Sequence, residues 1–445
     1  MNNRILIAGT NSGCGKTTVT IAILAALKAR GLDIASFKCG PDYIDPMFHR
    51  KVIGVNTHNL DPFFCEVDML RRLFSGQAGK DISIIEGVMG YYDGIGLSGD
   101  ASTYDVSRAL DAPVVLVLNA KGMSNSAGAI LQGFLNYRAN NNIKGVIFND
   151  LHEKQYPIMK HIAHEAGLNS YGFLPHISEF SIESRHLGLI MAEEIEDIKE
   201  KITVLGTFAE MHLNILDLLT LSKSTSKIEV DKFPIRNGKK SVRVAVSCDS
   251  AFSFLYMENI EMLEALGCEI AYFSPIKDKC LPENIGGLYL CGGYPELYIK
   301  ELSNNVDIRK DIKDAIESGL PTIAECGGFL YLHDTLDGAP MVGIIRAGAY
   351  KTDKLRRFGY ITLKAKKDNL LSPAGESIRA HEFHYYESMD CGDDFVAKKS
   401  GRNMTYSCIH ATETLYAGFP HLYFPANTSF AKTFVRKAII YAESY

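Results

Sequence analysis

The amino-acid sequence predicts two α/β domains: an N-terminal phosphate-loop domain, with a parallel sheet flanked by helices, and a C-terminal α/β domain. Apolar strand-like runs alternate with helical stretches in both halves of the chain. The segment 221–240 is rich in Ser, Lys and Asn and predicts a linker between domains at 1–220 and 241–445. The length of 445 residues suits two or three domains.

A glycine-rich loop joins the first predicted strand, 4–8, to the first predicted helix, 19–30. It carries a lysine and two threonines just before the helix. Inward-facing backbone N–H groups and the positive end of a helix dipole favour a bound polyphosphate. We therefore assign ATP binding to this loop, at Thr10, Asn11, Ser12, Gly13, Cys14, Gly15, Lys16, Thr17 and Thr18.

The loop is longer than the standard phosphate-binding pattern. Thr10 stands where that pattern begins with glycine, and Gly9 lies one residue earlier. This variant resembles the loop of dethiobiotin synthetase. Lys16 is expected to reach the terminal phosphates, and the Thr17 hydroxyl is expected to ligate Mg²⁺.

Acidic residues follow the next predicted strands. Asp42 and Asp45 lie in a loop bounded by Gly and Pro, where turn or capping roles are an equal alternative. Glu86 ends an apolar strand, and Asp93 lies in the glycine-rich loop after it. Because ligands of α/β sheets bind at the carboxyl edge, Asp45 and Glu86 are expected to join Thr17 around Mg²⁺, with Asp42 facing substrate.

Two more buried-type strands, 112–119 and 143–149, end in Asn119 and Asn149. An asparagine amide is able to hydrogen-bond an adenine edge. A turn at the strand end explains asparagine as well, so both interpretations stay open.

A candidate nucleophile lies in the second half of the chain. The stretch 321–332 reads as strand, acid, Cys326, paired glycines and helix, which is similar to a nucleophile elbow. A thiol at a helix N-terminus is expected to have a depressed pKa. The candidate bases are His381, His384 and His421, and spacing does not choose among them. His381 and His384 also hint at a metal site, although substrate or structural contacts are favoured.

Bulk properties exclude other classes. The net charge of −5 and the absence of a long basic run argue against nucleic acid, and no apolar stretch approaches membrane-spanning length. Ten scattered cysteines without a metal-binding pattern suit a reducing compartment, so a cytoplasmic protein is expected. Oligomeric state is open, a homodimer being one option.

Together, the motifs resemble those of the cobyrinic acid a,c-diamide synthase family over essentially the whole chain. They are AGTNSGCGKTT, FKCGPDYIDPMFH, NLDPFF, IIEGVMGYYDG, AFSFLYMENIEMLEALG, GGYPELY, IAECGGFLYL, HEFHY and GFPHLYF. The resemblance implies an ATP-dependent synthetase domain of the dethiobiotin-synthetase type and a class I glutamine amidotransferase-like domain. It also implies amidation of the a- and c-carboxylates of cobyrinic acid through acyl phosphates, with Mg²⁺, ATP and L-glutamine.

Carried over from the family, Cys326 attacks glutamine and His421 activates it, with oxyanion-hole N–H groups from Gly292 and Gly293. The synthetase-loop residues of the family map onto Asp42, Tyr43, Ile44, Asp45, Glu86 and Asp93. One departure concerns the last motif, where the second histidine of the family pattern is Tyr423. The resemblance supplies no acidic third member for a catalytic triad.

Three alternatives remain at this point. A sister enzyme performs the same chemistry on nickel-sirohydrochlorin in methanogen cofactor synthesis. A phosphate-loop regulatory ATPase with an inert Cys domain is disfavoured, because such a domain needs neither Cys326 nor His421. Cobyric acid synthase fits the GPDYIDP and EGVMGYYDG motifs less well.

Overall fold

The computed structural model describes residues 2–176, 184–185, 188–189, 198–230 and 241–444. The chain divides into two compact units, Met1–Phe233 and Pro234–Tyr445. The division falls within the predicted linker, of which residues 231–240 lie outside the described part. The beginning of that segment belongs to the first unit, because helix α8 runs to Ser222 and Arg4 Nη1 donates to the Ser226 carbonyl at 3.0 Å.

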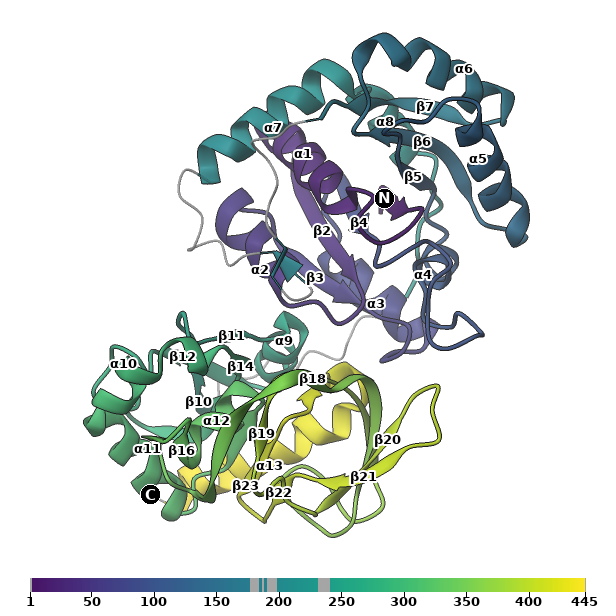
Figure 1. Cartoon of the computed structure of the whole chain (residues 1–445). Helices are drawn as coiled ribbons and strands as arrows, with labels where there is room; N and C mark the ends of the chain where they lie inside the picture. The colour runs from purple at the N-terminus through teal and green to yellow at the C-terminus, as the bar shows by residue number, and fades with distance from the viewer. Residues whose placement is uncertain (1, 177–183, 186–187, 190–197, 231–240, 445) are drawn as a thin grey trace. The chain divides into compact units, whose positions relative to one another are not determined.

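The first unit contains a parallel seven-stranded sheet in the order β3-β2-β4-β1-β5-β6-β7 (Figure 1). This confirms the predicted alternation of strands and helices. Its strands are β1 (Arg4–Gly9), β2 (Ile34–Cys39), β3 (Thr57–Leu60), β4 (Ile82–Glu86), β5 (Val114–Asn119), β6 (Ile143–Asn149) and β7 (Asn169–Leu174). Its α-helices are α1 (Lys16–Ala29), α2 (Ile44–Phe48), α3 (Val67–Gln77), α4 (Thr103–Ala109), α5 (Ser126–Tyr137), α6 (Tyr156–Glu165), α7 (Ile198–His212) and α8 (Ile215–Ser222). Two short strands, β8 (Ser184–Arg185) and β9 (Gly188–Leu189), pair with each other.

Helix α1 is the buried helix of this unit. Most of its apolar side chains are inaccessible to solvent, because it lies between the sheet and helix α7 (Figure 1). Gly206 of α7 permits the close approach, since a Cβ there would lie 3.1 Å from the Cβ of Ala25. The phosphate loop is thus attached to the most rigidly packed helix of the unit.

The second unit contains a six-stranded sheet in the order β12-β10-β13-β15-β23-β22, parallel except at β22. Its strands are β10 (Val242–Ser247), β12 (Cys268–Phe273), β13 (Ile285–Leu290), β15 (Thr322–Glu325), β22 (His410–Ala411) and β23 (Leu415–Gly418). The helices of the unit are α9 (Met257–Ala265), α10 (Ile299–Asn304), α11 (Val306–Glu317), α12 (Gly327–Tyr331) and α13 (Thr428–Ser444).

A second sheet in this unit was not anticipated from the sequence. It has the order β17-β16-β18-β19-β24, with β20 also paired to β18 and β21 paired to β20. Its strands are β16 (His333–Leu336), β17 (Ala339–Pro340), β18 (Ile345–Ala365), β19 (Ser377–Ser388), β20 (Phe395–Lys399), β21 (Thr405–Cys408) and β24 (His421–Leu422). A small antiparallel pair joins β11 (Phe252–Phe254) to β14 (Gly292–Gly293). Among the described residues, no helix combines the length and apolar character needed to cross a membrane.

Candidate active sites

The phosphate loop bends back tightly on the end of β1. Gly15 has φ +97°, a conformation that favours glycine. Gly9 is required for a different reason: a Cβ there would lie 2.6 Å from Cys14 Sγ and 2.7 Å from Lys16 Cδ. The Lys16 ammonium donates to the Asn11 carbonyl at 3.2 Å. Because position 9 is a glycine, the Lys16 side chain is able to fold back over the beginning of the loop.

The carboxyl ends of β2 and β4 bring acidic residues next to this loop. Glu86 at the end of β4 is fully buried and accepts a hydrogen bond from the Thr17 hydroxyl at 2.6 Å. Asp45 in α2 is also buried. Lys38 joins the two, because its ammonium contacts the Asp45 carboxylate and lies 2.8 Å from Glu86 Oε1. Burial opposes the charge on Lys38, but Asp45 and Glu86 outweigh it and raise its pKa well above the usual value.

Lys38 was missed by sequence reasoning. The sequence could have indicated this residue, because Lys38 stands in the largely apolar strand β2 just before the acidic loop. A buried ammonium needs buried counter-charges, so a lysine at this place pointed to the acids around it.

The residues present fit Mg²⁺ in their donor chemistry. Thr17 and Glu86 offer oxygen ligands, which this ion prefers, and Glu86 Oε2 is a buried acceptor without a hydrogen-bond partner. In the described part of the chain, no cluster of three or more His, Cys, Asp or Glu is placed to hold a metal. The site therefore suits an ion that is held by few protein ligands together with phosphate oxygens. Asp45 lies in the same cluster through Lys38.

Asp42 and Asp93 have different surroundings. Asp42 Oδ1 accepts the N–H groups of Ile44 and Asp45 at 2.9 and 3.1 Å, so it supports the turn into α2. Burial and the neighbouring Asp45 raise the pKa of Asp42 to about 7. Tyr43 and Ile44 are half-buried beside it. Asp93 is exposed, and its Oδ2 accepts the Gly90 N–H at 2.8 Å.

Asn119 and Asn149 are register partners at the ends of the neighbouring strands β5 and β6, but their side chains have different contacts. Asn149 Nδ2 donates to the Cys14 carbonyl at 3.2 Å, and a Cβ on Gly15 would lie 2.1 Å from that nitrogen. Asn149 therefore packs against the middle of the phosphate loop. Asn119 instead lines a cavity that borders Thr10 and Asn11 at the beginning of the loop.

Replacing Lys38 is expected to destabilise the first unit. In Lys38→Met, the buried Asp45 and Glu86 lose their counter-charge, which costs about 3 kcal/mol in the free energy of unfolding. Urea denaturation of the full chain measures this loss. Lys80→Met is the matched control, because the Lys80 side chain is 89% exposed. A loss no larger than that of the control would contradict the assigned role of Lys38.

In the second unit, Cys326 occupies a sharp turn between β15 and α12. Its φ of 47° is uncommon for a non-glycine residue and costs on the order of 1–3 kcal/mol. Its N–H donates to the Gly418 carbonyl of β23 at 2.8 Å, and its thiol lies 3.8 Å from the Phe383 carbonyl of β19. The strand–turn–helix geometry agrees with a nucleophile elbow.

The glycine pair and His421 converge on this turn. A Cβ on Gly292 would lie 2.3 Å from His421 Cε1, so the imidazole packs directly against that glycine. A Cβ on Gly327 would lie 2.8 Å from the Gly293 nitrogen, which places the β14 backbone beside the residue that follows Cys326. The structure thus brings together residues that are far apart in the sequence.

The expectation of a depressed thiol pKa is wrong for this structure. Burial raises the pKa of Cys326 well above its usual value, and the nearby acidic Glu296 and Glu382 raise it further. Helix α12 has five residues, too few to offset that desolvation. Burial also lowers the pKa of His421 to about 3, so its imidazole is neutral in this structure.

A buried carboxyl group lies beside His421 although the sequence motif offered none, and burial raises the pKa of this group, Glu325, to about 8. Glu325, directly before Cys326, is buried, and its Oε2 is 3.9 Å from His421 Nδ1. It accepts the Leu422 N–H and the Tyr289 hydroxyl, both at 3.0 Å, which fix its orientation. Sequence reasoning missed it because an acid before the nucleophile points away from that nucleophile in a regular strand.

Residues 5–190 match the family model of the CobQ/CobB/MinD/ParA nucleotide binding domain, and residues 243–428 match that of the CobB/CobQ-like glutamine amidotransferase domain. A cobyrinate a,c-diamide synthase of Clostridium acetobutylicum is 39% identical over 97% of this chain and 99% of its own length. This chain belongs to the cobyrinate a,c-diamide synthase family. Enzymes of the same name from Clostridium tetani and Thermoplasma volcanium are 37% and 36% identical, over 97% and 99% of this chain and 99% and 98% of their own lengths.

Within this family member, the HEFHY histidines are built into the second sheet. His384 Nε2 lies 3.0 Å from Glu382 Oε1, and its ring stacks on Phe419 with centroids 3.8 Å apart. His381 is paired in register with His421 across β19 and β24. These contacts agree with the structural role that the sequence favoured for both histidines.

Proposed function

We propose that this chain is a cobyrinate a,c-diamide synthase, which uses ATP and L-glutamine to amidate the a- and c-carboxylates of cobyrinic acid. The observation that carries the proposal is the presence of two complementary sites on one chain. One is a phosphate loop beside a buried Lys38–Asp45–Glu86 cluster, and the other is a Cys326 elbow beside His421. A regulatory ATPase would need only the first of these.

The first unit is proposed to activate the carboxylate. Backbone N–H groups of Gly13 to Thr18 hold the phosphates of ATP, and Lys16 balances the charge that develops on the transferred phosphoryl group. A carboxylate oxygen of the substrate attacks the γ-phosphorus, and ADP leaves. Thr17 and Glu86, with Asp45 nearby, would hold Mg²⁺, which when bound neutralises phosphate charge. The resulting acyl phosphate has a good leaving group, which the original carboxylate lacks.

The second unit is proposed to supply ammonia. The neutral His421 imidazole accepts the Cys326 thiol proton as the sulfur attacks the glutamine amide carbon. The N–H groups of Gly292 and Gly293 stabilise the oxyanion, and the amide nitrogen leaves as ammonia after it takes the proton. Water then releases glutamate from the thioester. Ammonia attacks the acyl phosphate, and phosphate leaves as the amide forms and a proton is lost.

Glu325 is proposed as the positioning residue for His421. Burial raises the pKa of Glu325 to about 8 in the resting site. When His421 becomes an imidazolium, its positive charge lies 3.9 Å from this carboxyl group and favours the ionised form of Glu325. Glu325→Gln keeps the shape and its acceptor oxygen for Leu422, and we expect glutaminase kcat to fall about 10- to 100-fold with little change in KM for glutamine. Equal thermal unfolding midpoints would exclude a folding defect. An unchanged kcat would remove Glu325 from the mechanism.

A cytoplasmic location is also proposed. All ten cysteines are free thiols, which suits a reducing compartment.

The substrate is tested by mass spectrometry of the product. With ATP and glutamine, two amidations on cobyrinic acid and none on nickel-sirohydrochlorin are expected. Mass gain on the nickel macrocycle alone would move the chain to the sister activity and would keep the roles assigned to both sites. ATP hydrolysis without any amidation would contradict the proposal.

A further inference from the structure

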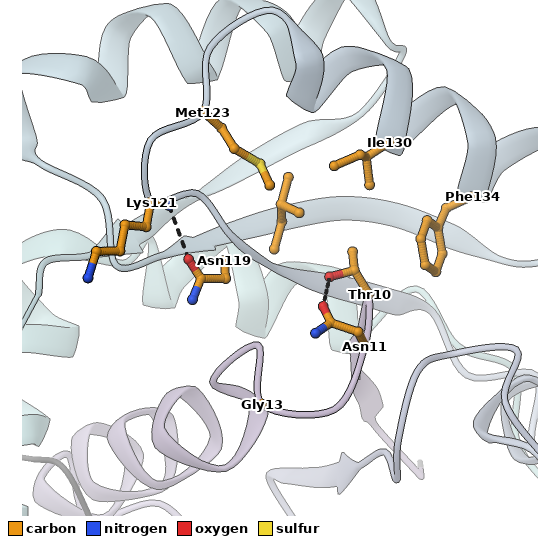
Figure 2. Close-up of a pocket in the computed structure, with 9 residues that line it drawn as sticks. Thr10, Asn11, Gly13, Asn119, Lys121, Met123, Ile130 and Phe134 are labelled. Carbon is orange, nitrogen blue, oxygen red and sulfur yellow. Dashed lines mark hydrogen bonds between the residues drawn. The ribbon is translucent and has the colours of Figure 1, made fainter.

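The first unit contains a cavity of about 400 Å³ between the beginning of the phosphate loop and helix α5 (Figure 2). Thr10 and Asn11 form its polar side. Ile130 and Phe134 of α5 form an apolar side across from them, and Leu118 near the end of β5 also lines the cavity. Such a combination of an apolar wall with few polar groups is typical of a small-molecule site.

The position of Lys16 shows which end of ATP faces this cavity. In a phosphate loop, the lysine reaches the β- and γ-phosphates while backbone groups hold the α- and β-phosphates. Here the Lys16 ammonium lies 3.2 Å from the Asn11 carbonyl, at the edge of the cavity. The γ-phosphate is therefore expected next to the cavity. The base, which is attached through the α-phosphate, is expected farther along the loop from Asn11. Asn149, beside Asn119 on the neighbouring strand, contacts the middle of the loop at Cys14 and is the asparagine left for the base.

We propose that this cavity is the subsite for the macrocycle of the phosphoryl acceptor, which rests on the proposed function. A group that must meet the γ-phosphate has to enter from the side where the γ-phosphate lies. The volume suits one edge of a tetrapyrrole-derived ring and not the whole ring. The apolar side packs on that edge while one peripheral carboxylate extends to the phosphate loop.

Polar groups at the rim match the remaining carboxylates of such a ring. Asn119 Oδ1 accepts the backbone N–H of Lys121 at 3.0 Å, which fixes its amide beside the loop (Figure 2). The Lys121 ammonium is 3.9 Å from Asp150, and its side chain is 72% exposed, so it is able to turn toward a ligand. A charged rim and an apolar wall together select an anionic macrocycle over a small polar acid.

The wall is also connected to the acidic loop that carries Asp93. Tyr92 stacks on Phe134 with ring centroids 5.6 Å apart, and its hydroxyl donates to the Phe134 carbonyl at 2.6 Å. The Tyr91 N–H, in the same loop, donates to the Gly9 carbonyl at 2.8 Å. The loop before Asp93 therefore holds α5 and the phosphate loop in a fixed relation around the cavity.

The test uses the full-length chain and equilibrium dialysis of cobyrinic acid, alongside steady-state kinetics. Ile130→Ala removes part of the apolar wall, and Lys121→Glu reverses the rim charge. Each is expected to raise Kd and KM for cobyrinic acid about fivefold, with KM for ATP and glutaminase activity changed less than about twofold. Matched controls are Ile158→Ala, whose residue is 53% exposed on α6, and Lys144→Glu at an exposed position of β6.

Three results would overturn the inference. A rise in KM for ATP alone would make the cavity the base site. Unchanged Kd and KM in both variants, with normal amidation by the unmodified chain, would remove the macrocycle from this cavity and leave the proposed function standing. Failure of the unmodified chain to bind or amidate cobyrinic acid would overturn the proposed function as well.

Discussion

Cys326→Ala is expected to abolish glutamine-dependent amidation and to leave ammonia-dependent amidation intact. The sulfur is the only group at the elbow that forms the thioester, so loss on the order of 10⁴-fold or more in glutamine-dependent kcat is expected. The phosphate loop and the Lys38–Asp45–Glu86 cluster belong to the first unit, whereas Cys326 belongs to the second, so the proposed activation does not use the thiol. Product formation with glutamine and with ammonium chloride at alkaline pH measures both activities.

Cys291→Ala is the matched control for this variant. Cys291 is a buried thiol beside β14, and burial raises its pKa as it does for Cys326. Cys291 does not lie at a strand-to-helix turn, so we expect the Cys291→Ala variant to keep glutamine-dependent activity. Equal losses in the two variants would indicate a packing effect and would contradict the nucleophile assignment. Loss of ammonia-dependent activity in Cys326→Ala would contradict the assignment of carboxylate activation to the first unit and of ammonia supply to the second.

Lys16→Ala is expected to impair carboxylate activation and to spare glutamine hydrolysis, whereas Cys326→Ala impairs only the use of glutamine. It should remove amidation with either nitrogen source, by about 10²- to 10³-fold or more, because the transferred phosphoryl group loses its cation. Basal glutamine hydrolysis should remain. Separate assays of ADP release, amide formation and glutamate release measure the three activities.

Lys28→Ala on the same helix is the control for Lys16→Ala, because Lys28 is exposed and donates to the Gly54 carbonyl. Amidation near the level of the unmodified chain in Lys16→Ala would mean that this loop does not bind the reacting phosphates. The activating site would then have to lie elsewhere.

The sequence was sufficient for features that depend on local pattern. The phosphate loop, the strands β1, β2, β4, β5 and β6 of the first sheet and the strand–Cys–helix turn follow from apolar periodicity and glycine placement, whereas the edge strands β3 and β7 were not predicted. The observed α1 begins at Lys16, before the predicted start at residue 19, because the helix continues directly from the left-handed Gly15. The residue at which a helix begins depends on the backbone conformation of one residue, here Gly15, which the apolar pattern does not reveal.

Features that depend on long-range packing could not be predicted. The contact of Glu325 with His421 requires β15 and β24 to meet across 96 residues of sequence separation, and no local periodicity encodes that meeting. The long strands β18 and β19 were missed because polar and charged residues alternate irregularly along them. The raised pKa of Cys326 likewise follows from burial by distant segments, which a motif does not reveal.

We expect one chain to convert two carboxylates of cobyrinic acid to amides through acyl phosphates, with nitrogen from glutamine. The most direct measurement is a single reaction with cobyrinic acid labelled with ¹⁸O in its carboxylates and glutamine labelled with ¹⁵N in its amide. The expected product carries two ¹⁵N atoms, with one ¹⁸O transferred to inorganic phosphate for each amide formed. Phosphate without ¹⁸O, or a product without ¹⁵N, would contradict this reaction sequence.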